Sequence, residues 1–167
     1  LIVDDDSINC LLAKHALAKE YQTAAVNSGR AALAYLEKEL PDLILMDIEM
    51  PKMNGKEVLR RIKAHKEWSK IPVMFMTALS ELETEAECLE LGADDFIAKP
   101  IKPLIMASRV SKLLELYDLR KDLAAIPEIR EFTVTPGGGG GGMSGASTVD
   151  VKVFGHDMTT AMTTAKD

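Results

Sequence analysis

The chain has 167 residues, a mass of 18.2 kDa and a formal net charge of −6. A chain of this length suits one ordinary domain with a sizeable core, and its acidic balance argues against direct contact with nucleic acid. The longest apolar run, residues 71–79, is far shorter than the roughly 20 residues that a membrane span requires, so no membrane association is expected.

The two cysteines, Cys10 and Cys88, stand alone and lack the spacing of a metal site. Such cysteines are usual in a reducing compartment, so we expect a cytoplasmic location and structural thiols rather than a disulfide. The chain begins at Leu1, directly in an apolar run, so we expect its natural beginning to have been trimmed.

Short apolar runs alternate with helical patterns five times along the chain. The runs predict strands at residues 1–3, 21–26, 43–46, 71–76 and 96–98. The first helix is expected to begin at a Ser7 cap and to carry Ile8, Leu11, Leu12 and Ala16 at helical spacing; later helices are expected at residues 31–40, 56–66 and 80–91 and from Pro103. This alternation predicts an α/β fold, a doubly wound five-stranded parallel sheet with helices on both faces.

The apolar run at residues 43–46 lies between Pro41 and Pro51 and ends in Asp47. It is too short for a core helix, and its unbroken apolar character is typical of a strand buried on both faces. In an open parallel sheet, the functional crevice lies outside the carboxyl ends of the strands. Asp47 is therefore predicted to lie in that crevice.

Three other predicted strands also end in polar side chains, which are Asp4-Asp5-Asp6, Thr77 and Lys99 in chain order. Clustered carboxylates repel one another strongly unless a cation joins them. An all-oxygen site suits a hard divalent cation, and Mg²⁺ prefers one or two carboxylates together with water and phosphate oxygens. The pattern predicts an acidic Mg²⁺ site with a hydroxyl and an ammonium beside it.

This ordered set of strand ends resembles the receiver domain of two-component response regulators. The resemblance covers roughly residues 1–117 and rests on Val3-Asp4-Asp5, Asp47 with Met50-Pro51 and Gly55, Thr77-Ala78, and Lys99-Pro100. It implies a flavodoxin-like receiver fold that works as a phosphoacceptor signalling switch. In such a switch, Asp47 accepts a phosphoryl group from a histidine kinase or a histidine phosphotransfer protein in a Mg²⁺-dependent reaction.

The resemblance also implies how the metal is held. Asp5 and Asp47 would bind Mg²⁺ directly, Asp4 would bind it through water, and the backbone carbonyl of Glu49 would supply a further ligand. The cation would neutralise the charge that develops on a phosphoryl group during transfer.

The remaining implied roles concern the phosphorylated state. Lys99 would pair with one phosphoryl oxygen and the Thr77 hydroxyl would bond another, while the Lys99–Pro100 peptide bond would be cis. Phe96 stands where the family has its switch aromatic. Because it is Phe rather than Tyr, a ring movement can persist but a contact that needs a hydroxyl cannot.

Two other functions compete with the switch. Asp4-Asp5-Asp6 after a strand also fits the signature of haloacid-dehalogenase-like phosphohydrolases, with Asp4 as nucleophile, Asp6 as acid/base and Asp94-Asp95 as a later acidic pair. That hypothesis leaves Asp47 and Lys99 unexplained, so we favour a switch over an enzyme with an external substrate. A degenerate receiver that acts only as a scaffold is a third possibility, and the complete acidic set argues against it.

The last helix is expected to continue past the receiver domain, which we assign to residues 1–118. Leu116, Leu119, Leu123 and Ile126 keep a three-four-three spacing, which is typical of a helix seam. About 24 residues of helix would end at Pro127. The second half is expected to form either a homodimer contact or a stalk leading to an output domain.

Residues 119–136 are assigned to the end of this helix and a linker, and residues 137–142 are six consecutive glycines that behave as a flexible linker. Residues 143–167 are expected to be an appended, low-complexity tail or a fused peptide. Within it, Val149, Val151 and Val153 alternate with polar residues, as in an edge strand.

Overall fold

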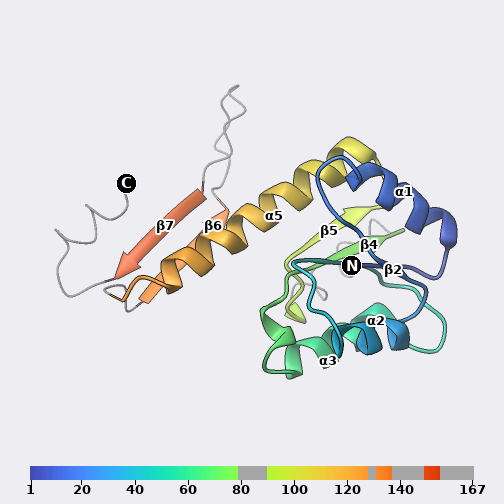
Figure 1. Ribbon diagram of the computed structural model, residues 1–167, viewed down its shortest axis with the longest axis horizontal. Helices are drawn as coiled ribbons and strands as arrows, with labels where there is room; N and C mark the ends of the chain where they lie inside the picture. Colours follow the sequence, from blue (N-terminus) through green and yellow to red (C-terminus); the bar gives the residue numbers. More distant parts are fainter. Residues whose placement is uncertain (79–89, 128–130, 137–148, 155–167) are drawn as a thin grey trace. The chain divides into compact units, whose positions relative to one another are not determined.

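The computed structural model describes residues 1–78, 90–127, 131–136 and 149–154 (Figure 1). The chain divides into two compact units, Leu1–Leu114 and Glu115–Asp167. No helix in these described ranges is long and apolar enough to cross a membrane.

The first unit is built on a five-stranded, all-parallel sheet with the strand order β2-β1-β3-β4-β5. The strands are β1 (Ile2–Val3), β2 (Ala25–Val26), β3 (Ile44–Asp47), β4 (Val73–Thr77) and β5 (Asp95–Ala98). The predicted fold class and all five strands are confirmed. β1 and β2 are shorter than predicted, because only two residues of each form the ladder.

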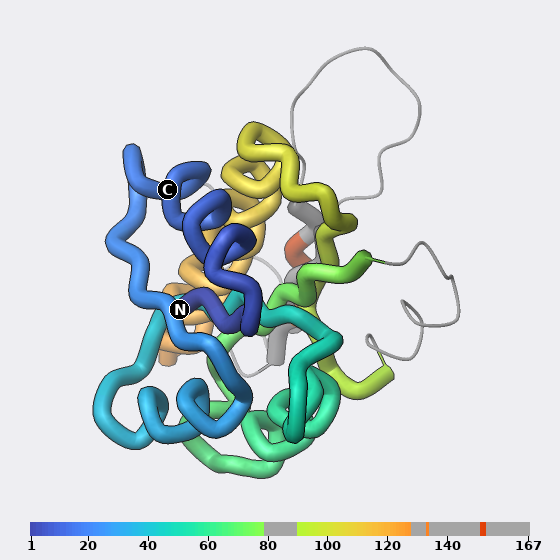
Figure 2. The backbone as a smooth tube through the Cα atoms, turned by 90° about the vertical axis from the view of Figure 1, so that its right-hand side faces the viewer, coloured from blue at the N-terminus to red at the C-terminus, as the bar shows by residue number. Residues whose placement is uncertain are grey.

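Helices cover both faces of the sheet. They are α1 (Ser7–Leu17), α2 (Gly29–Leu36), α3 (Gly55–Ala64) and α5 (Pro103–Ala124), with a short 3₁₀ helix η1 (Trp68–Lys70) before β4. Figures 1 and 2 show α1 and the first half of α5 on one face, and α2 and α3 on the other. The helix predicted at residues 80–91 lies almost entirely outside the described residues.

The core follows from the alternation of side chains along each strand. Val3, Ile44, Met46, Val73 and Phe75 pack in one cluster with apolar residues of α2 and α3. Their neighbours on the same strands, such as Leu45 and Met74, are equally buried, as expected when successive side chains point to opposite covered faces.

The start of α1 differs from the prediction. Asp6, not Ser7, is the N-cap, and Asp6 Oδ1 accepts a hydrogen bond of 2.8 Å from the Ile8 backbone N–H. Ser7 already belongs to the helix. Both residue types are good caps, and the sequence places them side by side, so composition alone could not choose between them.

The most apolar stripe of α1 is not the face that the helix buries. Ala13 and Leu17 are buried, whereas the side chains of Ile8, Leu11 and Leu12 are 64%, 67% and 44% exposed. The helical spacing therefore predicted the helix correctly, but these three residues lie on its solvent face.

α5 has 22 residues and ends at Ala124, close to the predicted end at Pro127. In the second unit, β6 (Glu131–Pro136) and β7 (Val149–Phe154) pair antiparallel, with Val134 opposite Val151. The alternation of valines predicted β7 correctly. β6 was not predicted, and the six glycines lie outside the described residues.

Candidate functional site

The parallel register brings the predicted strand ends to one edge of the sheet. Val3 is level with Met46, Asp47 with Met76, and Thr77 with Ala98. The residues that end or follow these strands therefore meet at the carboxyl edge, where an open parallel sheet binds its ligands.

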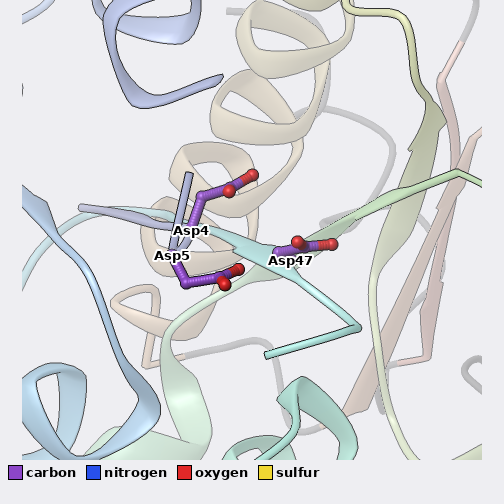
Figure 3. A group of neighbouring side chains, drawn as sticks. All are labelled: Asp4, Asp5 and Asp47. Atoms are coloured by element: carbon purple, nitrogen blue, oxygen red, sulfur yellow. The ribbon is translucent and has the colours of Figure 1, made fainter. Parts of the chain in front are cut away.

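Three carboxylates from two neighbouring strands form the centre of the site. Asp4 and Asp5 follow β1 and Asp47 ends β3, and the three neighbouring side chains point to the same side (Figure 3). Each offers an oxygen atom within 4.8 Å of the others. Asp4 is fully buried and Asp47 is 6% exposed, whereas Asp5 lies on the surface.

Lys99 joins the two buried carboxylates. Its Nζ lies 2.8 Å from Asp47 Oδ2 and 2.9 Å from Asp4 Oδ2. Burial lowers the pKa of Lys99, but hydrogen bonds and charge attraction from Asp47 and Asp4 outweigh it and raise the pKa overall. Lys99 therefore stays an ammonium ion. Its peptide bond to Pro100 is cis, as the resemblance implied.

The first turn of α1 fixes Asp4 on its other side. Asp4 Oδ1 accepts hydrogen bonds of 2.9 Å from the Asp6 backbone N–H and 3.2 Å from Asn9 Nδ2. Asp4 Oδ2 accepts no hydrogen bond but forms the ion pair with Lys99, so each oxygen of this buried carboxylate faces a polar partner.

Burial makes the anionic form of Asp47 less favourable. Burial raises the pKa of Asp47, and the hydrogen bond and charge of Lys99 offset only part of this effect, while the charge of Asp4 adds to it. The three carboxylates and the Lys99 ammonium together carry a formal charge of −2, which is −3 from the acids and +1 from Lys99.

This excess of negative charge fits a divalent cation. Mg²⁺ is a hard cation that binds carboxylate oxygens and keeps several water ligands, so a cluster with one exposed and two buried carboxylates suits it. The acidic cluster expected from the sequence is thus present. Glu49, whose backbone carbonyl is the fourth proposed ligand, is exposed in the loop between β3 and α3.

Of the cavities that open at this edge, two are lined by Ile48, Glu49 and Lys56. The first, the Asp47 cavity, has a volume of about 200 Å³ and is lined by Asp47, Ile48, Glu49, Lys56, Thr77, Ala78 and Lys99. The second, the Asp5 cavity, has a volume of about 530 Å³ and is lined by Asp5, Ile48, Glu49, Met50, Pro51, Asn54 and Lys56. Asp47, Thr77 and Lys99 therefore share one small space, which can hold a group such as a phosphoryl.

Gly55 sets how closely α3 approaches the site. Its N–H donates to the Ile48 carbonyl at 2.8 Å, and a Cβ at this position would collide with the Asp47 carbonyl and the Phe75 ring. The backbone of α3 can therefore begin directly against the end of β3 only if this residue has no side chain.

The predicted switch aromatic, Phe96, lies in β5, two residues before the end of that strand. It is level with Phe75 in the sheet and is half-buried against the core. Sequence reasoning missed two residues near the site, Asn9 and Lys56. Asn9 could have been found from its place in the helical turn after Asp4, and Lys56 from its place directly after Gly55.

The phosphohydrolase hypothesis finds no support in this geometry. Asp6, its proposed acid/base, is exposed and caps α1. Asp94 and Asp95 lie at the start of β5. In a parallel sheet the strand starts lie at the edge opposite the strand ends, so this pair is remote from the carboxylate cluster. There Asp94 binds Lys63 and Asp95 binds Arg109.

Comparisons with known proteins agree with the strand-end pattern. Residues 1–111 match the family model of the response regulator receiver domain. A probable cyclic di-GMP phosphodiesterase of Vibrio cholerae is 41% identical over 115 residues, which are 69% of this chain and 26% of that protein. The response regulator PleD of Caulobacter vibrioides is 39% identical over 114 residues, which are 68% of this chain and 25% of that protein.

Solved structures give the same result. The signal receiver domain of a signal transduction histidine kinase from Syntrophus aciditrophicus is 41% identical, with a TM-score of 0.63 over 68% of this chain and 87% of that one. The chain spans about a quarter of the length of the two curated relatives above. It belongs to the family of response regulator receiver domains.

Proposed function

We propose that Asp47 is the phosphoacceptor of this receiver domain. The observation that carries the proposal is the placement of a buried carboxylate, Asp47, beside the Lys99 ammonium and in the same small cavity as Thr77. A carboxylate with these neighbours can act as a nucleophile and then keep the transferred group in contact with a cation and a hydroxyl.

The transfer has a simple atom balance. An Asp47 carboxylate oxygen forms a bond to the phosphorus of a phosphohistidine, the phosphorus–nitrogen bond breaks, and its electron pair returns to the imidazole. Lys99 leaves its contact with Asp47 to pair with a phosphoryl oxygen, and the Thr77 hydroxyl donates a hydrogen bond to another. Later attack by water on phosphorus releases inorganic phosphate and restores the Asp47 carboxylate.

Asp5 and Asp47, with the Glu49 backbone carbonyl, are the proposed direct holders of Mg²⁺, and Asp4 is proposed to bind it through water. The formal charge of −2 on the cluster supports this assignment. When bound there, Mg²⁺ would neutralise negative charge on the phosphoryl group during its transfer.

Receiver domains take their phosphoryl group from histidine kinases or histidine phosphotransfer proteins. We propose that the donor protein contacts the exposed stripe of α1, which consists of Ile8, Leu11 and Leu12. Leu11 supports this idea because it lines one surface cavity of about 570 Å³ together with Asp4 and Asp5. A partner that covers this stripe would therefore also reach the acidic cluster.

The rest of the chain is proposed to link the receiver to further parts of the protein. In this division, residues 1–118 are the receiver domain and residues 119–136 continue from it. Residues 137–142 are a glycine linker and residues 143–167 an appended segment. The seam in the second half of α5 would serve as a homodimer contact or as a stalk; sedimentation velocity over a range of concentrations distinguishes these roles. A cytoplasmic location is part of the same proposal.

The proposed function is tested by intact-mass spectrometry. The protein is incubated with acetyl phosphate and Mg²⁺, and then treated with hydroxylamine. We expect the mass to rise by one phosphoryl group and the added group to be lost to hydroxylamine, as an acyl phosphate would be. No gain in mass, or a gain that resists hydroxylamine, would contradict the proposal.

A further inference from the structure

Lys56 brings a second positive charge to the phosphoryl-acceptor site. This basic residue lines both the Asp47 cavity and the Asp5 cavity. Its side chain is half-buried. Lys99, the other lysine of the Asp47 cavity, forms ion pairs with Asp4 and Asp47.

The backbone of Lys56 is held close to the acceptor strand. The preceding residue, Gly55, donates its N–H to the Ile48 carbonyl and lies against the Asp47 carbonyl. Lys56 is therefore one residue from a fixed contact with the end of β3, and its flexible four-carbon side chain extends from an anchored position.

Helix stability does not explain a lysine at this position. Lys56 is the second residue of α3, whose N-cap is Asn54. The helix dipole favours anions at a helix N-terminus and disfavours cations there. A basic side chain that opposes this preference and also lines the acceptor cavity points to a role in the site.

We infer that Lys56 binds the incoming phosphodonor and the transferred phosphoryl group, and that it does so at the expense of Mg²⁺ affinity. This inference rests on the proposed function of Asp47. Phosphodonors are anions, so a cation that lines the Asp47 cavity attracts them. The same charge lines the Asp5 cavity, where it repels a divalent cation.

The inference predicts two effects of opposite sign in one variant. Lys56→Gln should lower the second-order rate constant for phosphorylation by acetyl phosphate about fivefold, measured at saturating Mg²⁺ and low salt. It should also tighten the binding of Mg²⁺ alone by about the same factor, measured by NMR titration of the unphosphorylated protein. The rate difference between the parent and Lys56→Gln should shrink at high salt.

Two further variants control the experiment. Lys56→Arg keeps the charge and should resemble the parent in both measurements. Lys70→Gln removes an exposed lysine of η1 that lines neither cavity, and it should change neither.

The outcomes separate this inference from the proposed function. Three outcomes would show that Lys56 does not act through its charge: Lys56→Gln matches Lys70→Gln in both measurements, Lys56→Gln slows phosphorylation and weakens Mg²⁺ binding together, or Lys56→Arg behaves like Lys56→Gln. In each case the inference is wrong, while Asp47 remains the acceptor. If the parent protein takes up no phosphoryl group, then the proposed function itself fails, and the inference fails with it.

Discussion

Lys99 Nζ lies 2.8 Å from Asp47 Oδ2, so the ammonium that is proposed to bind the phosphoryl group is already in contact with its acceptor. The same ammonium contacts the fully buried Asp4 at 2.9 Å. Phosphorylation of Asp47 would place new anionic oxygens beside Lys99, and the lysine would then exchange a carboxylate for a phosphoryl partner. This exchange offers a direct way for a chemical change at Asp47 to move the end of β5.

The first prediction concerns Lys99 and Thr77 as residues that act after transfer. Lys99→Ala and Thr77→Ala should still accept a phosphoryl group at Asp47, because neither residue supplies the nucleophile. Both should show a weakened conformational response, measured as the NMR shift changes of β5 and α5 at equal phosphate occupancy. Responses equal to that of the parent would contradict the proposed switch.

Lys99→Ala should also show how much the acidic cluster destabilises the folded protein when its cation is missing. Without the ammonium, the buried Asp4 and Asp47 carboxylates lose their shared cation. We expect the free energy of unfolding in the absence of Mg²⁺ to fall by about 1–3 kcal/mol. Chemical denaturation with and without Mg²⁺ measures this loss, and added Mg²⁺ should restore part of it.

The second prediction concerns Asp5 as a metal ligand. In the parent, Mg²⁺ at about ten times its dissociation constant should add about 1.4 kcal/mol to the free energy of unfolding. Asp5→Asn should abolish most of this gain. Without Mg²⁺, the variant should melt at a slightly higher temperature than the parent, because one of three repelling carboxylates is gone. A full Mg²⁺ response in the variant would remove Asp5 from the ligand set.

The third prediction concerns Gly55. Gly55→Ala should lower the free energy of unfolding by about 1–3 kcal/mol, because a Cβ would collide with the Asp47 carbonyl and the Phe75 ring. It should also slow phosphorylation by acetyl phosphate, since α3 must move away from the acceptor strand.

Gly29→Ala is the matched control for Gly55→Ala. A Cβ at Gly29 would meet Val58 and Met53, which both belong to the core cluster. We expect a loss of stability without a change in the phosphorylation rate. Equal rates in both variants would show that Gly55 serves packing alone.

The fourth prediction concerns the exposed stripe of α1. Leu11→Glu should reduce phosphotransfer from the cognate histidine kinase about tenfold, as for a residue in the centre of an interface, because it places a charge on an apolar contact. Phosphorylation by acetyl phosphate should stay within twofold of the parent. The same substitution at an exposed leucine outside α1, Leu40→Glu, is the control and should leave the transfer unchanged. If the kinase does not distinguish Leu11→Glu from the parent, the donor protein binds elsewhere.

Most of the fold could be predicted because its main signals are local. The unbroken apolar run before Asp47 predicted a strand buried on both faces, and every residue of β3 is buried. The strand-end positions of Asp4, Asp5, Thr77 and Lys99 were also sufficient to place these residues together, because parallel strands bring their carboxyl ends to one edge.

The remaining features depend on interactions that a linear pattern does not contain. The spacing of Ile8, Leu11 and Leu12 predicted a helix. It did not predict that the buried residues of this helix would be Ala13 and Leu17. Lys56 was predicted only as the first residue of a helix, and the close packing at Gly55 places it in the site. β6 alternates polar and apolar residues over a short segment, and its pairing partner lies beyond the glycine run.

The most direct test of the account is the mass of three proteins after incubation with acetyl phosphate and Mg²⁺: the parent, Asp47→Asn and Asp4→Asn. We expect a hydroxylamine-labile phosphoryl group on the parent. Asp47→Asn should gain none, because an amide is not a nucleophile. Asp4→Asn should be labelled more slowly, because it keeps the acceptor but loses part of the metal support. Labelling that survives in Asp47→Asn and disappears in Asp4→Asn would contradict the assignment of Asp47 as the acceptor.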